Sequence, residues 1–155
     1  MPKLILLLTF CPLIIKGQNV YLESNIGMSN IDGIGIMPGA SFLIGKRFEK
    51  LESDFLLDME IGLAFPTIVT GKIGGGIFID RRLKSAILVG IRPWPLHLYT
   101  QVNLAERPKG QFILSLEAGS ALFDERIGNI YFDELSAYST FILNIGYRWN
   151  IGKNE

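Results

Sequence analysis

The stretch FLLDMEIGLAF, residues 55–65, alternates apolar residues with polar or small ones. Phe55, Met59 and Phe65 share one phase of the alternation, while Asp58 and Glu60 share the other. A period of two residues is typical of a β-strand, because successive side chains point to opposite faces. The segment therefore predicts a strand with one apolar face and one face that carries charges.

The same alternation continues on both sides of this stretch and predicts an all-β fold. Segments with turn-forming residues separate the alternating runs, and no helical period competes over a useful length. The predicted strands are residues 19–29, 33–46, 55–65, 68–80, 85–94, 96–104, 111–122 and 140–151. Eight antiparallel strands of about ten residues are typical of a closed up-and-down barrel, in which no sheet edge is exposed.

The first 17 residues depart from the alternation. Lys3 supplies a positive charge, an almost wholly apolar run extends from Leu4 to Ile15, and Gly17 precedes a polar segment. This order is typical of a secretory signal peptide, and the run is shorter than the roughly 20 residues of a membrane-spanning helix. We expect a signal peptide over residues 1–17, the barrel over 18–151 and a short C-terminal tail over 152–155.

Composition narrows the class of barrel. The chain has 155 residues, of which 48% are hydrophobic and 19% charged, with a formal net charge of zero and one cysteine. A net charge of zero gives no excess of positive charge for binding nucleic acid, and a single cysteine excludes a disulfide scaffold. Two barrels remain. A lipocalin-like carrier directs its apolar face inward toward an apolar ligand, whereas an outer-membrane barrel directs that face to lipid.

The glycines favour the membrane barrel. Thirteen glycines fall within the predicted strands, and eleven of them share the phase of the polar residues. Glycine weakens a strand, so this concentration needs a packing reason, and the crowded interior of a narrow eight-stranded barrel supplies one. A solvent-facing surface would instead be rich in Lys, Glu and Thr. The apolar phase carries almost no charge between its ends.

With these features the chain resembles the small eight-stranded outer-membrane β-barrel proteins of Gram-negative bacteria, over residues 18–151. The likeness includes an aromatic-rich last strand, Asn144 to Trp149. In that family such a strand is read by the outer-membrane assembly machinery. The resemblance therefore implies this machinery and membrane lipid as partners, and the cell outer membrane as the location. Because the family contains anchors, adhesion proteins, small pores and lipid enzymes, the resemblance selects no activity.

An inward polar phase places charged side chains in the barrel interior. Unpaired charges in so narrow a space are costly, so we expect a network that plugs the lumen. The predicted network residues are Glu23, Asp58, Glu60, Lys72, Arg92, Glu117 and Arg148. Closure of the barrel and the turn at Pro66 predict the pairs Glu23–Arg148 and Glu60–Lys72. The alternative is an ion-conducting path lined by the same residues.

Aromatic residues in the predicted strands could supply girdles at the two membrane interfaces. The candidates are Phe42, Phe55, Phe65, Trp94, Tyr147 and Trp149.

A catalytic or metal site finds little support in the sequence. His97 is the only histidine, Tyr99 occupies the adjacent position on its face, and no serine follows within that strand. A Ser–His acyl-transfer site needs a nucleophilic serine beside the histidine, and a transition metal needs more ligands of this kind. We expect no catalytic, cofactor-binding or metal-binding residues, and a structural or interaction role in the cell envelope. A periplasmic lipocalin-like carrier, a small pore and a lipid-modifying enzyme stay as alternatives.

Overall fold

The computed structural model describes residues 20–31, 35–49, 53–65, 67–94, 96–119 and 139–151. The expected signal peptide and C-terminal tail lie outside these residues. Within the described ranges, no helix is long and apolar enough to cross a membrane.

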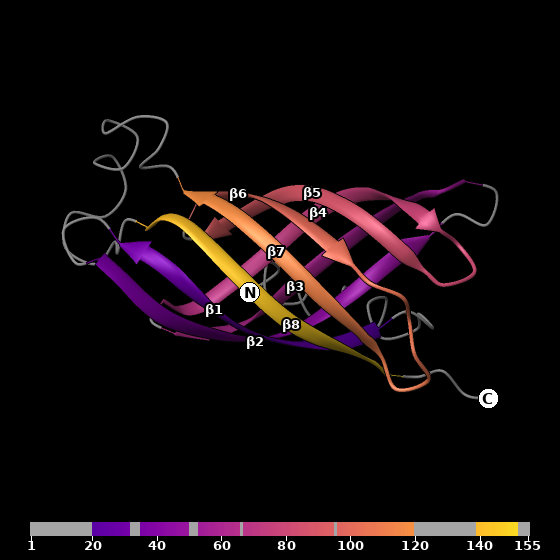
Figure 1. Ribbon diagram of the computed structural model, residues 1–155, viewed down its shortest axis with the longest axis horizontal. Helices are drawn as coiled ribbons and strands as arrows, with labels where there is room; N and C mark the ends of the chain where they lie inside the picture. The colour runs from indigo at the N-terminus through magenta and orange to yellow at the C-terminus, as the bar shows by residue number, and fades with distance from the viewer. Residues whose placement is uncertain are drawn as a thin grey trace, which may run out of the picture.

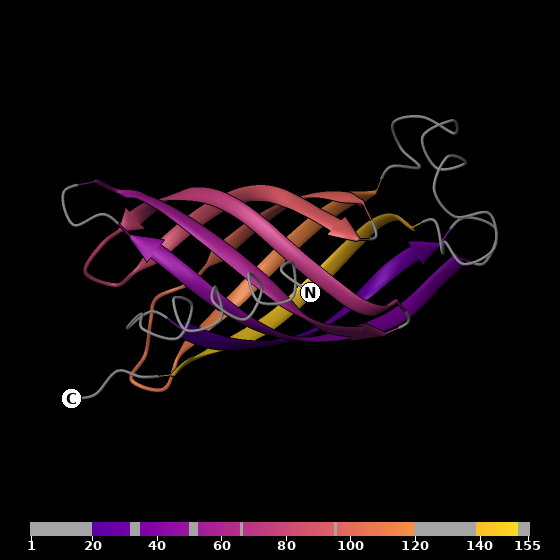
Figure 2. The ribbon, with the colours of Figure 1, turned by 180° about the vertical axis from the view of Figure 1, so that it is seen from behind.

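The described chain is a single antiparallel sheet of eight strands that closes on itself (Figures 1 and 2). Each strand pairs with its neighbours in sequence, and the last strand pairs with the first. The strands are β1 (Val20–Ile31), β2 (Gly35–Glu49), β3 (Phe55–Phe65), β4 (Ile68–Asp80), β5 (Ser85–Trp94), β6 (His97–Asn103), β7 (Gln111–Gly119) and β8 (Ser139–Ile151). The predicted all-β, eight-stranded, up-and-down barrel is therefore confirmed as a fold.

Three strands, β3, β4 and β5, have the bounds that the alternation predicts. The strand β2 extends furthest beyond its predicted bounds, to Glu49 rather than Lys46, while residues 120–122 of the predicted seventh strand lie outside the described residues. The sequence interpretation placed Arg47 in a turn, but Arg47 continues the inward phase of Leu43 and Gly45 and is buried. The alternation therefore continues past Lys46, because Arg47, the next inward residue, has a partner in the neighbouring strand.

The barrel has two different ends. The start of β1 and the end of β8 lie at one end, which we call the terminal rim, together with the β2–β3, β4–β5 and β6–β7 connections. The strands β1, β3, β5 and β7 end at the opposite end, which we call the far rim. In Figure 1 the terminal rim is on the right, where the C-terminus is marked.

The two phases of each strand differ sharply in exposure. Along β7, for example, inward residues Gln111, Ser115 and Glu117 are buried, while outward Leu114 and Leu116 are exposed. Most outward positions of the described strands carry apolar residues, and the one charge among these positions is Lys46 near the terminal rim. The barrel is therefore apolar outside and largely polar inside, which is the reverse of an ordinary soluble domain.

The interior is not polar throughout. Leu56, Phe78, Ala86 and Leu88 form a buried apolar cluster inside the barrel, on the wall made by β3, β4 and β5 near the terminal rim. Phe78, Ala86 and Leu88 share the inward phase with charged residues, so this part of the interior is apolar beside the charged network. An eight-stranded barrel is narrow enough for side chains to fill it, so part of its interior can pack as an ordinary core.

Inward glycines make room for two buried tyrosines. A methyl group built on Gly45 would lie 2.5 Å from the ring of Tyr21, and one on Gly74 would collide with the hydroxyl of Tyr99. Both tyrosines are almost fully buried. These glycines thus have the packing role that the sequence pattern suggested, since any larger residue would displace an aromatic ring.

Candidate functional site: the charged interior of the barrel

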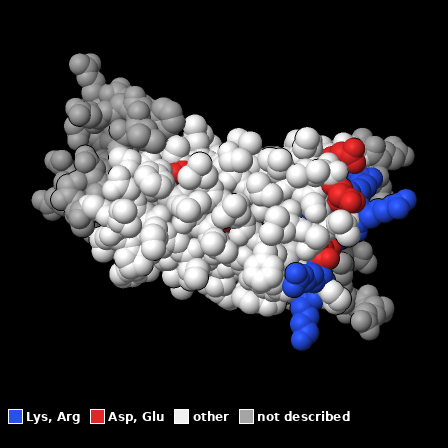
Figure 3. All heavy atoms as spheres, in the orientation of Figure 1, with Lys and Arg blue, Asp and Glu red and all other residues white. Residues whose placement is uncertain are grey.

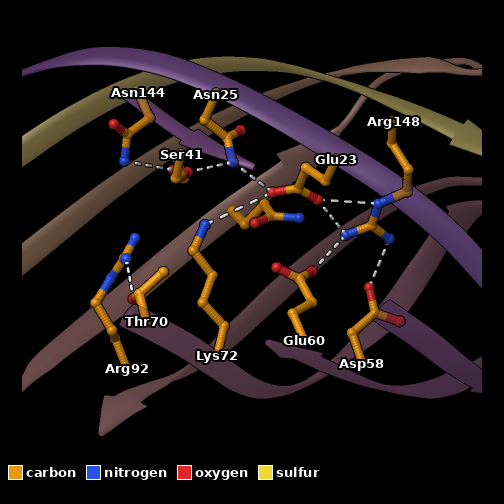
Figure 4. Close-up of polar contacts among 12 residues, drawn as sticks. Glu23, Asn25, Ser41, Asp58, Glu60, Thr70, Lys72, Arg92, Asn144 and Arg148 are labelled. Atoms are coloured by element: carbon orange, nitrogen blue, oxygen red, sulfur yellow. Dashed lines mark hydrogen bonds and ion pairs between the residues drawn. The ribbon is translucent and has the colours of Figure 1, made fainter. Parts of the chain in front are cut away.

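Eight charged side chains of the described residues lie buried inside the barrel. The structure places all seven predicted network residues there, with Arg47 as an eighth member. Four are carboxylates and four are cations, so the formal charges cancel when all are ionised. They are Glu23, Asp58, Glu60 and Glu117 with Arg47, Lys72, Arg92 and Arg148. Figure 4 shows six of them, Glu23, Asp58, Glu60, Lys72, Arg92 and Arg148, which point from strands around the barrel into the lumen.

Arg148 on β8 is the centre of the half of the network nearer the terminal rim. Its Nη2 donates to Glu23 Oε2 at 2.7 Å and to Glu60 Oε1 at 2.8 Å, and its Nη1 donates to Asp58 Oδ2 at 2.7 Å. The guanidinium also lies 3.6 Å from the centroid of the Tyr21 ring, and the Tyr21 hydroxyl donates to Glu60. One cation is therefore held by three carboxylates and an aromatic face, a combination that suits the planar guanidinium.

Arg47 extends this half of the network toward the terminal rim. Its Nε and Nη2 donate to the two oxygens of Asp58, both at 2.8 Å, in a bidentate pair. Arg47 and Asp58 are direct partners in the β2–β3 register. Sequence reasoning missed Arg47 because it ended the strand at Lys46, although one further step of the alternation would have placed it inward.

Arg92 and Glu117 form the half of the network nearer the far rim. The Arg92 Nε and Nη2 donate to the two Glu117 oxygens at 2.7 and 2.6 Å, and Nη1 donates to the Thr70 hydroxyl at 2.5 Å. Thr70 in turn donates to the backbone carbonyl of Trp94. Asn144 adds a hydrogen bond to Glu117. Charge pairing and hydrogen bonding together satisfy both oxygens of this buried carboxylate.

Lys72 connects the two halves. Its Nζ lies 3.7 Å from Glu23 and 3.6 Å from Glu117, both of which already pair with an arginine. It makes no hydrogen bond to any residue that the structure describes. The ammonium is therefore held between two carboxylates by charge attraction rather than by a directed contact.

The two predicted pairs have different outcomes. Glu23 and Arg148 are direct partners in the register that closes the barrel, and they form an ion pair. Glu60 and Lys72 are also direct partners across β3 and β4, as the turn predicts. However, Glu60 pairs with Arg148, while the ion pairs of Lys72 go to Glu23 and Glu117. The register was right and the pairing was wrong, because a lysine side chain is long enough to reach across a narrow lumen.

Neutral polar side chains surround the charges. The Asn25 amide donates to Glu23 and to the Ser41 hydroxyl, and Asn144 donates to Ser115. His97 is buried on the inward face of β6, where Arg92 is its partner in the adjacent strand. Among the described residues, no cluster of His, Cys, Asp or Glu is arranged to hold a metal ion. The arrangement is a connected set of ion pairs, and each half of the network contains both carboxylates and cations.

The six aromatic candidates project from the outer face of the barrel. Phe55, Tyr147 and Trp149 lie toward the terminal rim, and Phe65 and Trp94 lie at the far rim. Phe42 lies midway along β2, away from both ends of that strand. Two rings that sequence reasoning did not select, Phe48 and Phe112, are also exposed near the terminal rim.

Charges on the outside of the described barrel gather at the terminal rim. Figure 3 shows them at its right-hand end, while the barrel wall facing the viewer is almost entirely uncharged. The residues are Lys46, Glu49, Asp54, Asp80, Arg81, Arg82, Lys84, Glu106, Arg107 and Lys109. The apolar wall thus ends at a band of charge on this side.

Comparisons of the chain with protein-family models, with curated proteins and with solved structures found no match.

Proposed function

We propose that the protein is an integral β-barrel of the cell outer membrane, with a structural or interaction role in the envelope and a lumen plugged by its charged network. It is not an enzyme in this proposal and needs no cofactor. In this proposal membrane lipid surrounds the outer wall of the barrel, and the outer-membrane assembly machinery recognises β8 and inserts the protein.

The observation that carries the proposal is the orientation of the two faces. Mid-strand residues such as Ile61, Leu63 and Val89 are each about 60% exposed or more on the outer wall, while eight charges are buried inside. In water this arrangement would expose a continuous apolar surface far larger than soluble monomers tolerate. In a bilayer the same wall is favourable, and the closed sheet leaves no unpaired backbone edge in lipid.

Strand length supports the same proposal. A β-strand crosses the hydrocarbon layer with about 9–11 residues when it is tilted. Seven of the eight strands have between 9 and 15 residues, and β6 has 7. The strands run obliquely to the long axis of the barrel in Figures 1 and 2.

The interior argues for a plug over a carrier or a pore. A lipocalin-like carrier would need an apolar cavity, whereas this lumen holds paired charges with a packed apolar cluster at one end. Four buried carboxylates matched by four cations fill a space that is only wide enough for side chains. The network therefore supplies the internal partners that a membrane barrel needs for its inward polar groups.

Fractionation of cells that express the full chain tests the proposal. We expect the protein in the outer-membrane fraction, resistant to extraction with alkaline carbonate, and migrating faster on a gel before heating than after it. A protein recovered freely soluble from the periplasm, with the same migration heated and unheated, would contradict the membrane role. A soluble periplasmic protein made in the same cells is the control for leakage between fractions.

A further inference from the structure

The β6–β7 turn is a tight reversal at the terminal rim that carries two cations. The Arg107 N–H donates to the Gly110 carbonyl at 2.7 Å, and the Gly110 N–H donates to the Arg107 carbonyl at 3.0 Å. Pro108 and Lys109 therefore form the tip of a two-residue loop. Arg107, Pro108 and Lys109 are all exposed. The loop fixes the backbone from which both cationic side chains project.

A cluster of three outward aromatic rings adjoins this turn. The Phe112 and Tyr147 ring centroids are 5.0 Å apart, as are those of Tyr147 and Trp149. The guanidinium carbon of Arg107 lies 5.8 Å from the Phe112 centroid. Arg107 thus stands at the border between the apolar wall and the charged rim. Aromatic rings of this kind lie at the headgroup level of a membrane when the barrel is embedded.

The cations of this turn differ from two other cations on the same rim, Arg81 and Lys84, which are paired. Lys84 pairs with Glu106 and Arg81 pairs with Asp54, both at 3.5 Å. Arg107 and Lys109 form no ion pair with any residue in the described part of the chain. Two positive charges that have no ion-pair partner among the described residues, beside an aromatic surface, complement an amphiphile whose polar end is an anion. The guanidinium fork matches the oxygens of a phosphate.

We infer that Arg107 and Lys109 bind the phosphate of an anionic membrane phospholipid, whose glycerol and upper acyl chains pack on Phe112, Tyr147 and Trp149. The inference rests on the proposed membrane function and adds a lipid site to it. Juxtamembrane cations contribute roughly 1 kcal/mol each toward an anionic surface, which is about fivefold in affinity. Removing either cation should therefore lower the preference for anionic lipid about fivefold.

The two tryptophans allow the site to be observed directly. Trp149 belongs to the aromatic cluster at the terminal rim, and Trp94 lies at the far rim, where the outer surface of the described strands carries no charge. The full chain with Trp94→Phe reports on the site, and the chain with Trp149→Phe reports on the opposite end. Each is refolded into vesicles that contain graded fractions of brominated phosphatidylglycerol or brominated phosphatidylcholine, and quenching of fluorescence is measured.

We expect brominated phosphatidylglycerol to quench Trp149 more strongly than brominated phosphatidylcholine, with no such preference at Trp94. In the Trp94→Phe background, Arg107→Gln and Lys109→Gln should each reduce the preference about fivefold. Arg82→Gln is the matched control, since Arg82 is an exposed cation of the β4–β5 turn that has no ion pair or aromatic contact in the described structure. It should leave the preference unchanged.

Four outcomes would overturn the inference. Equal quenching of Trp149 by both lipids, or a preference unaffected by Arg107→Gln and Lys109→Gln, would remove the site while leaving the membrane barrel intact. A preference abolished by inorganic phosphate, but not by chloride at equal ionic strength, would identify free phosphate rather than lipid as the ligand. Absence of quenching by either brominated lipid would instead count against membrane insertion itself, and with it the proposed function.

Discussion

The Arg148 guanidinium on the last strand lies 2.7 Å from the Glu23 carboxylate on the first strand, although the two residues are 125 positions apart in the sequence. They are direct partners in the seam that closes the barrel. Closing this seam therefore brings the central cation of the interior to its carboxylates. The charged network and the closed sheet are formed by the same event, so damage to one should be seen in the other.

Replacement of Arg148 by methionine should destabilise the barrel strongly. The change removes one cation from Glu23, Asp58 and Glu60, and it leaves buried carboxylates without sufficient compensation. Breaking a buried charge pair by removing one partner costs about 3–5 kcal/mol. Urea unfolding of the barrel in vesicles, monitored by its heat-modifiable gel migration, measures the loss in the free energy of unfolding. Arg82→Met on the exposed β4–β5 turn is the control and should change the free energy of unfolding by less than about 0.5 kcal/mol. If Arg148→Met behaves like that control, the network does not stabilise the closed barrel.

Much of this interior could be predicted from the alternation of the sequence. Each strand has a buried face, so a register error of one residue would expose every inward side chain, and the phase is strongly determined. The inward placement of Glu23, Asp58 and Lys72 follows from their phase alone. The partners of Glu23 could also be predicted in part, because closure of an up-and-down barrel joins its first and last strands.

The remaining features depend on distances across the lumen, which a strand pattern does not contain. Lys72 reaches Glu117 on β7 from β4, and Arg148 reaches Asp58 on β3 from β8. Neither pair is adjacent in the sheet. Phe78 and Leu88 are apolar residues on the otherwise polar inward phase. They pack in one buried cluster inside the barrel, so their strands keep the same inward face. Side-chain reach and local packing decided these contacts.

The plug should keep the barrel closed to ions, and it should do so in two layers. We expect the unaltered protein to give no stable openings in planar bilayers. Arg92→Ser with Glu117→Ser removes bulk and charge near the far rim, but the apolar cluster around Phe78 still fills part of the lumen near the terminal rim. This double variant should also stay closed. Adding Phe78→Ala should leave the barrel closed as well, because Arg148 with Glu23, Asp58 and Glu60 still occupies the lumen, and gel migration should show that this variant is folded. Stable, sizeable openings from the unaltered protein would refute the plug.

Gly74 should tolerate no side chain while Tyr99 keeps its hydroxyl. The Cβ of Gly74→Ala would collide with that hydroxyl, and forced overpacking of this kind costs about 1–3 kcal/mol. Tyr99→Phe in the same chain should recover part of the loss, because it removes the nearest atom but leaves the ring. Gly39→Ala is the matched control, since its nearest neighbour would be the Phe65 carbonyl at 3.3 Å. Urea unfolding of the unaltered protein, Gly74→Ala, Tyr99→Phe and the double variant measures the coupling, with Gly39→Ala as the control. Strictly additive effects would show that the two residues do not meet.

An arginine placed on the outer wall distinguishes a membrane barrel from a soluble one. Val89 lies in the middle of β5 and is 60% exposed, while Ile36 is 72% exposed near the far rim end of β2. In water, either substitution would replace an exposed apolar residue with a solvated charge at little cost. In a bilayer, Val89→Arg should cost about 2–4 kcal/mol and Ile36→Arg about 0–1 kcal/mol, because the penalty for a charge on the lipid face falls with distance from the midplane. Unfolding of both variants in vesicles measures this difference. Equal free energies of unfolding for the two variants would mean that no hydrocarbon layer surrounds the middle of the barrel.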